Sequence, residues 1–319
     1  MEPLGISVIE EKKSELQKPF LKWVGGKTQI ISKILSKFPK EMTNYNELFL
    51  GGGSILLGVL SLVEMGKINI TGEIYAYDLN KGLINTYEQI KKNPLELIKN
   101  LNVLKKNFIS IKVNSEGQRG KPKEITDLTY KKSREHYYYW VRDKYNNEEK
   151  NTVQSACKFI FLNKTGFRGM YREGTNGFNI PYGLKDRKTI PSIFNEKDIK
   201  EISKLIQKVN FNTMSFKDSI KNIKKGDFVY LDPPYAPENE VSFVSYLIDG
   251  FDLKTHKLLF EKIKKLDDDG VKFVMSNSKV DLVTKSFKDF KCEDVLARRA
   301  INSKKPGSKT TEVIIYNLD

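Results

Sequence analysis

Residues 45–64 read YNELFLGGGSILLGVLSLVE, and this stretch decides the fold. Residues 45–50 form a short apolar segment typical of a strand, three glycines follow, and residues 54–64 are apolar at helical spacing. A strand, a glycine-rich turn and a helix open an α/β unit and form a cradle of nucleotide size. Tight packing of a helix on a sheet also selects glycine, so this segment alone leaves the ligand open.

The α/β pattern continues on both sides of this stretch. Upstream, apolar residues at helical spacing predict a helix over residues 28–38, which stops at Pro39. Downstream, residues 68–77 predict a strand ending at Asp78. The remaining predicted elements are helices at 80–93 and 254–266, strands at 227–231 and 271–276, and a terminal hairpin of residues 294–301 and 311–317. Strands that alternate with helices indicate a parallel sheet.

The middle of the chain differs, because strand signals thin out between residues 94 and 191. The segments 95–108, 133–145 and 152–163 predict helices, residues 113–126 predict a polar mobile loop, and residues 163–183 predict a loop rich in glycine, arginine and aromatic residues. We therefore predict one α/β domain, residues 1–93 and 192–319, interrupted by a mostly helical insertion, residues 94–191. Residues 1–17 predict a solvent-exposed arm.

Composition narrows the class of protein. The 319 residues are enough to bury a sizeable core, and the apolar runs are far shorter than the roughly 20 residues that span a bilayer. The first 13 residues lack the apolar core of a secretory signal, and 2 cysteines cannot form a disulfide framework. We expect a cytoplasmic protein without a metal, since 2 histidines and 2 cysteines argue against a zinc site. The net charge of +15 indicates either a nucleic-acid partner or a compositional bias toward lysine, asparagine and isoleucine.

The strongest functional signal is Asp232-Pro233-Pro234-Tyr235, directly after the apolar residues 228–231. Ligands of open α/β sheets bind at the carboxyl ends of strands. A carboxylate and a backbone carbonyl can each accept one N–H of an aromatic amine, which directs the amine lone pair toward an electrophile. The prolines fix the backbone and leave carbonyls free, and the tyrosine ring can stack on a planar base. The alternative is a strand that ends in a Pro-Pro turn capped by the aspartate.

Two further segments carry chemistry. Asp78 follows Gly53 by about 25 residues, close to the spacing at which a carboxylate binds a ribose diol. Residues 20–28, FLKWVGGKT, end in Gly-Lys-Thr, but Leu21 stands where a P-loop requires glycine, so we reject a P-loop. Lys27 and backbone amides at a helix start can instead hold a carboxylate, and Trp23 is either part of this site or core.

The segments at 20–27, 49–53 and 232–235, in that order along the chain and with an insertion between the last two, resemble the Dam-type adenine-specific DNA methyltransferases. The resemblance also covers LNKTGFRGMYR at 162–172, FNIPYG at 178–183, SNS at 276–278 and RRAI at 298–301. It implies the class I, Rossmann-like fold of methyltransferases that use S-adenosylmethionine (AdoMet), with a seven-stranded sheet and a helical DNA-recognition insertion. It further implies AdoMet as cofactor, double-stranded DNA as partner and no metal, with the chain acting as a monomer or as a dimer on DNA.

The resemblance also implies roles for individual residues. The cofactor-binding set is Trp23, Gly25 and Lys27 at the methionine end, Phe49, Gly51 and Gly53 in the turn, Asp78 on the ribose, Phe216 on the adenine, and Asp232. Asp232 and the Pro233 carbonyl hold the target amine, Pro234 completes the turn, and Tyr235 stacks on the flipped base. A sulfonium methyl is already activated, so catalysis reduces to alignment, and flipping the base costs a few kcal/mol.

The insertion is expected to read DNA. Arg168 and Arg172 suit bidentate contact with guanine, and Met170 lies between these two arginines in the sequence. Phe167 can wedge into the base stack. Lys22, Lys131, Lys132 and Arg134 are either phosphate contacts or ordinary solvated basic residues, and Arg298 and Arg299 are further DNA-binding candidates. Relatives that read GATC usually carry asparagine in place of Arg168 and leucine in place of Met170, whereas Arg172 matches their guanine reader. GATC is the first expectation, and CATG or another short palindrome stays open.

Four other functions fit part of the pattern. An RNA adenine or a protein glutamine suits the same acceptor logic, although glutamine enzymes typically begin the motif with asparagine where this chain has Asp232. A DNA-binding relative without activity is disfavoured by the intact motifs. A nucleotide-dependent oxidoreductase explains the glycine turn alone.

Overall fold

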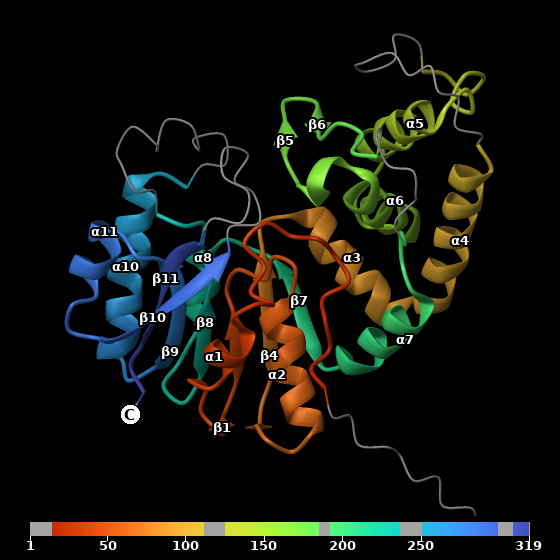
Figure 1. Ribbon diagram of the computed structural model, residues 1–319. Coiled ribbons are helices and arrows are strands. Elements are labelled where there is room, and N and C mark those ends of the chain that lie inside the picture. Colours follow the sequence, from red (N-terminus) through yellow and green to blue (C-terminus); the bar gives the residue numbers. More distant parts are fainter. Residues whose placement is uncertain (1–14, 112–124, 185–191, 237–250, 299–308, 319) are drawn as a thin grey trace, which may run out of the picture.

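Seven strands form one mixed sheet in the order β10-β11-β9-β8-β2-β4-β7 (Figure 1). The computed structural model describes residues 15–111, 125–184, 192–236, 251–298 and 309–318. The strands are β2 (Tyr45–Glu47), β4 (Ile74–Asp78), β7 (Val209–Thr213), β8 (Phe228–Leu231), β9 (Lys272–Ser278), β10 (Lys291–Arg298) and β11 (Lys309–Tyr316). Only β11 breaks the parallel pattern among them, pairing antiparallel with both β9 and β10. The predicted α/β class and seven-stranded sheet are confirmed.

The strand order reverses direction between β2 and β8. From β2 the chain builds outward to β4 and β7, then returns to place β8 on the other side of β2, with Tyr45 opposite Phe228. Ligands of α/β sheets bind at such a reversal, outside the carboxyl ends of the strands. The glycine turn after β2 and Asp232 after β8 therefore lie at the same edge of the sheet.

Helices cover both faces of the sheet, which explains its continuous apolar strands. On β8, Phe228 and Tyr230 enter one core while Val229 and Leu231 enter the other, as the alternation of a strand requires. The first face packs on α1 (Ile31–Leu35), α2 (Ser54–Glu64), α3 (Lys81–Lys92) and α7 (Glu196–Leu205). The second packs on α8 (Phe216–Ser219), α10 (Leu253–Asp268) and α11 (Asp281–Ser286), on the opposite side in Figure 1.

A group of helices lies beyond α3, on the side away from α10 (Figure 1). It consists of α4 (Pro94–Ser110), α5 (Arg134–Asn146) and α6 (Val153–Thr165), followed by a 3-10 turn η1 (Phe167–Gly169) and a small hairpin, β5 (Glu173–Gly174) and β6 (Gly177–Phe178). Helix α6 packs on both α3 and α4. One continuous core therefore joins these helices to the first face of the sheet.

Several predicted elements match closely. Helix α2 spans the predicted residues 54–64, and β10 and β11 pair as the predicted terminal hairpin. The predicted helix at 28–38 is shorter, because residues 27–30 form a turn in which Ile30 N donates to Lys27 O at 3.0 Å. The predicted loop at 163–183 contains the end of α6, η1 and the hairpin. Residues 113–124 of the predicted mobile loop lie outside the described residues.

Two predictions are wrong in detail. Residues 68–77 are not one strand: β3 (Asn69–Ile70) pairs with β1 (Glu41–Met42), and β4 joins the main sheet. The chain turns at Gly72, where a Cβ would lie 2.3 Å from Asn44 Oδ1. The predicted exposed arm ends in a buried residue, because Gln17 N donates to Ser61 Oγ of α2 at 2.9 Å. Residues 1–14 of that arm lie outside the described residues.

Within the described ranges, no helix combines the length and apolar character needed to cross a membrane.

Candidate active site at the carboxyl ends of strands β2, β4 and β8

Asp232 is the first residue after β8, and both of its carboxylate oxygens are engaged. Oδ2 lies 2.7 Å from the Lys27 ammonium, and Oδ1 accepts a hydrogen bond from Ser276 Oγ at 2.9 Å. Burial raises the pKa of the Asp232 carboxyl, while Lys27 and Ser276 oppose this shift because they stabilise the anion. The motif thus presents a charge held by two specific partners.

Lys27 lies between the two groups of the motif that were predicted to hold a base. Its side chain is 3% exposed, and its Nζ donates to Gly25 O at 2.5 Å. The same ammonium lies 4.8 Å from the centre of the Tyr235 ring, in cation–π geometry. An incoming amine would therefore compete with Lys27 for both Asp232 and the ring face.

The motif is also fixed from the far side. Tyr235 OH donates to Glu312 Oε2 of β11 at 2.6 Å. The next residue, Ala236, donates its N–H to Asn277 Oδ1 at 3.2 Å, and its carbonyl accepts from Ser278 Oγ at 2.6 Å. Pro233 and Pro234 cannot donate backbone hydrogen bonds, so side chains of β9 and β11 take over the anchoring of this turn.

The glycine turn after β2 depends on the absence of side chains. Gly53 caps α2 with φ of 70°, and a Cβ there would lie 2.2 Å from Tyr87 OH. Gly51 has φ of 49°, and its N–H donates to Asp78 Oδ2 at 2.9 Å. Asp78 Oδ1 accepts from Asn80 N at 2.9 Å, which leaves lone pairs of this carboxylate available for hydroxyl donors.

Three phenylalanine rings form an apolar wall beside this turn. Phe49 and Phe216 lie 5.8 Å apart, and Phe251 lies 6.0 Å from Phe49 and 5.7 Å from Phe216. Phe49 and Phe216 were predicted from the sequence, whereas Phe251 was not. A signal was present, since Phe251 directly precedes Asp252, the side-chain cap of α10.

Trp23 connects the glycine turn to the helical part. Its ring stacks at 5.8 Å on Tyr171 and at 6.4 Å on Phe159, and a Cβ on Gly51 would lie 3.0 Å from its Cδ1. Trp23 is therefore partly core and also borders the turn, so the two alternatives for it are compatible. Gly25 is exposed with φ of 79°.

Glu47 is a buried carboxyl that the sequence analysis did not single out. It is 2% exposed and accepts a hydrogen bond from Tyr45 OH at 2.7 Å. Burial raises the pKa of Glu47 to about 8, and the negative charges of Asp232 and Asp78 add to the shift. Glu47 is therefore mostly neutral at pH 7, which limits the negative charge at this edge of the sheet.

This shift predicts a pH-dependent stability. The folded state retains the Glu47 proton up to pH of about 8, whereas an unfolded glutamate loses it near 4.5. The free energy of unfolding should therefore fall, by a few kcal/mol, as pH rises between these values. Urea denaturation across this range measures the effect, which Glu47→Gln should flatten and the exposed Glu41→Gln should leave in place. An equally steep profile in Glu47→Gln would refute it.

The predicted DNA-binding residues gather around η1 and the β5–β6 hairpin. Phe167 is 44% exposed, Arg168 is exposed with φ of 55°, and the Arg168 guanidinium lies 5.1 Å from the Phe167 ring centre. Arg172 is exposed, and its Nε donates to Asn179 Oδ1 at 2.7 Å. Met170 instead packs partly buried against the core.

The other basic candidates are more scattered. Lys22 lies against α6 and η1. Asn163 of α6 hydrogen-bonds the Lys22 backbone at 2.9 and 2.7 Å, and a Cβ on Gly169 of η1 would touch the Lys22 side chain. Arg134 donates to carbonyls of α4, and Lys131 and Lys132 are exposed. Arg298 ends β10, and its side chain and all of Arg299 lie outside the described residues.

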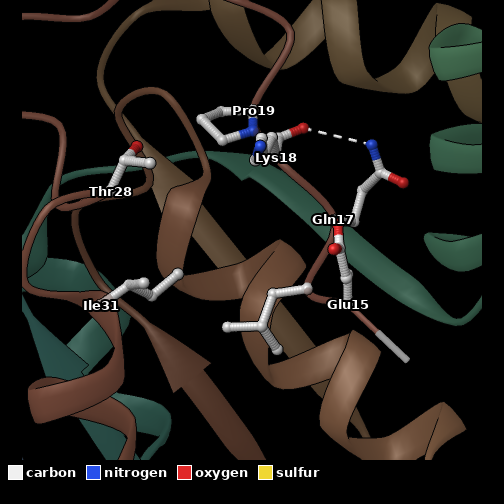
Figure 2. Close-up of a pocket in the computed structure, with 7 residues that line it drawn as sticks. Glu15, Gln17, Lys18, Pro19, Thr28 and Ile31 are labelled. Atoms are coloured by element: carbon white, nitrogen blue, oxygen red, sulfur yellow. Dashed lines mark hydrogen bonds between the residues drawn. The ribbon is translucent and has the colours of Figure 1, made fainter. Parts of the chain in front are cut away.

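A pocket of about 340 Å³ lies under the segment from Glu15 to Pro19, closed on the other side by Thr28 and Ile31 (Figure 2). None of the predicted site residues lines it. Among residues that the structure describes, no three histidine, cysteine, aspartate or glutamate side chains are placed to hold a metal ion.

Comparison with known proteins covers nearly the whole chain. Residues 23–301 match the model of the family described as D12 class N6 adenine-specific DNA methyltransferase. The chain is 36% identical over 297 residues to the type II methyltransferase M.MjaIII of Methanocaldococcus jannaschii, covering 90% of this chain and 93% of that protein. It is 31% identical over 320 residues to M1.LlaDCHI of Lactococcus lactis, covering 98% and 99%. A DNA adenine methylase of Vibrio cholerae is 25% identical over 303 residues, covering 94% and 95%.

Proposed function

The chain belongs to the D12 class of N6 adenine-specific DNA methyltransferases, and from this premise we propose that it methylates the exocyclic amine of an adenine flipped out of a short palindromic duplex site. The observation that carries the proposal is the position of Asp232. Its carboxylate lies at the strand reversal, held by Ser276 and Lys27, beside the face of Tyr235. This arrangement suits an aromatic amine as ligand.

The residues at this edge fit AdoMet. The turn at Gly51 and Gly53 has no side chains, the Asp78 carboxylate beside it has free lone pairs for a ribose diol, and the rings of Phe49 and Phe216 offer an apolar wall for an adenine. Trp23, Gly25 and Lys27 would border the methionine end, where the Lys27 ammonium can pair with a carboxylate. When bound, AdoMet supplies a methyl group already activated by a sulfonium.

The protein's own task is to orient the acceptor. Asp232 Oδ2 and the Pro233 carbonyl would each accept one N–H of the amine, which turns the nitrogen lone pair away from the base plane. Lys27 must then leave Oδ2 and the Tyr235 face, so that the ring can stack on the base. Holding the reacting atoms in line lowers the barrier mainly because the entropy of aligning them is already lost on binding. As the N–C bond forms, the S–C bond would break and S-adenosylhomocysteine would leave. The methylated nitrogen, then positively charged, gives up one proton to water, so no strong base is needed.

The DNA-reading side of the proposal rests on residues 94–191. Exposed Phe167 is suited to fill the gap left by the flipped base, and this replaces part of the few kcal/mol lost in unstacking. Arg168 and Arg172 present guanidinium groups to solvent in the same region. GATC is the first candidate sequence and CATG the second, because Arg168 and Met170 depart from the usual GATC readers.

Arg172 gives the sharpest test of sequence reading. Arg172→Ala should lose about 1–3 kcal/mol of discrimination at one base pair, because a bidentate guanine contact disappears. Arg172→Lys should lose a similar amount, since lysine keeps the charge but not the two-pronged geometry. Methylation rates on a panel of single-base site variants measure both. Lys131→Ala serves as the control and should weaken all sequences alike, and the same uniform loss in Arg172→Ala would make Arg172 a phosphate contact.

The proposed function is tested by sequencing that detects modified bases, on DNA from cells that express the chain. Methyladenine at one short motif, absent with an Asp232→Asn chain, is the expected result and identifies the recognition sequence. A folded chain that binds AdoMet but leaves DNA unmodified would overturn the proposal and point to an RNA or protein acceptor.

A further inference from the structure

Asp232 is the end of a buried hydrogen-bonded chain that runs back into the sheet. Ser276 on β9 is fully buried, and its Oγ lies 2.9 Å from Asp232 Oδ1 and 2.9 Å from the hydroxyl of Tyr230. The backbone explains the alignment. Tyr230 and Asp232 are two residues apart and share a face of β8, and β9 runs parallel beside it with Val274 opposite Tyr230.

The chemistry of the three groups fixes the direction of this chain. An ionised carboxylate can only accept, so the single proton of Ser276 Oγ points to Asp232. The serine oxygen then accepts from Tyr230, whose hydroxyl must be the donor. Burial raises the pKa of the Tyr230 phenol well above its usual value, so Tyr230 retains the proton that it donates.

This order has a consequence for the two carboxylate oxygens. Oδ1 is held by a side chain that is buried and cannot leave, whereas Oδ2 faces Lys27 and the Tyr235 ring. Rotation of the carboxylate would break the Ser276 hydrogen bond inside the sheet. The oxygen at the open side is therefore always Oδ2, in one orientation.

We propose that Ser276 is a positioning residue for methyl transfer: with Tyr230 behind it, it locks the Asp232 carboxylate so that Oδ2 alone receives the target amine. This inference rests on the proposed function, because it assigns Asp232 to the acceptor amine. Neither residue touches the substrate. Ser276 and Tyr230 act only by fixing the orientation of the Asp232 carboxylate, which sets the direction of the amine lone pair.

The experiment compares kcat and KM of Ser276→Ala, Ser276→Thr, Tyr230→Phe and the double variant Ser276→Ala/Tyr230→Phe. Ser276→Ala should lower kcat about 10–100-fold, because loss of an orienting partner misaligns the reacting groups. KM for DNA and Kd for AdoMet should be nearly unchanged, because neither ligand contacts Ser276. Ser276→Thr keeps the hydroxyl and should restore most of kcat. Tyr230→Phe should have a smaller effect, and the double variant should be no slower than Ser276→Ala.

A pH profile separates positioning from general damage. Ser276→Ala removes a hydrogen bond that stabilises the Asp232 anion, so the pKa of Asp232 rises and the acidic limb of kcat moves to higher pH. The wild-type and Ser276→Ala proteins share the charged and titratable groups that face Asp232. These groups are Lys27, Glu47, Tyr230 and Tyr235. Ser61→Ala, a buried serine of α2, is the control for stability and should leave kcat and the profile unchanged.

Three results would overturn the assignment: a kcat of Ser276→Ala no lower than that of Ser61→Ala, a change confined to KM, or independent losses that multiply in the double variant. A wild-type chain without any methyl transfer to DNA would instead overturn the proposed function. The two failures are distinguishable because the first requires an active wild-type enzyme.

Discussion

Replacement of Asp232 by asparagine is expected to lower methyl transfer by about 10³-fold or more, while the protein still folds and binds DNA. Asparagine has nearly the same shape, but its amide presents N–H donors where the amine needs an acceptor. The negative charge that both orients the amine and stabilises the positive charge developing on it is also lost. Transfer of labelled methyl groups to duplex DNA measures the rate, and fluorescence anisotropy measures DNA binding.

The control is another aspartate of the same chain. Asp269 directly follows α10, close in the chain to the amino end of β9, whereas Asp232 follows the carboxyl end of β8. It forms an exposed ion pair with Lys265 at 3.1 Å. Asp269→Asn should leave methyl transfer within about twofold, because exposed ion pairs contribute little. Turnover by Asp232→Asn close to that of Asp269→Asn would exclude Asp232 as the amine acceptor.

The largest effect on stability is expected at Gly53. Gly53→Ala should destabilise the fold by about 2–4 kcal/mol, because it combines a left-handed backbone with a Cβ placed against the Tyr87 hydroxyl. The turn between β2 and α2 must shift to relieve the contact, so AdoMet affinity should fall as well. Urea denaturation and calorimetric titration with AdoMet measure the two effects.

Comparison with a second glycine of positive φ separates the cost of the left-handed backbone from the cost of the Tyr87 contact. Gly66 has φ of 71° and nothing within 4 Å of a Cβ, so Gly66→Ala should cost only the backbone strain, about 1 kcal/mol. In a Tyr87→Phe background the cost of Gly53→Ala should shrink, because the nearest atom is gone. Equal costs at Gly53 and Gly66 would mean that the Tyr87 contact is unimportant.

Local patterns were sufficient to predict which candidate residues follow the carboxyl ends of strands. The glycine turn, Asp78 and Asp232 each follow an apolar strand, and the edge to which parallel strands bring such residues is a general property of the fold. The same reasoning missed β7 and α7, although β7 completes the sheet. Its sequence, VNFNT, carries two asparagines on the less buried face, so an edge strand there has a weak apolar signal.

The partners of the turn at Asp232–Tyr235 could not be predicted in this way. Ser276 and Glu312 come from β9 and β11, and only the pairing register places them at Asp232 and Tyr235. The contact between Lys27 and Asp232 likewise joins segments with no local pattern in common. Spacing along the chain identifies residue types suited to chemistry, whereas the side chains that orient them depend on tertiary packing.

The order of strands also determines the order in which the site can assemble. Strand β10 precedes β11 in the chain, yet within the described residues it meets the sheet only through β11. Strand β11 lies between β9 and β10, so β10 can form its hydrogen bonds to the sheet only when β11 is in place. Because β11 carries Glu312, a chain in which only the parallel strands have paired still lacks the hydrogen bond that holds Tyr235.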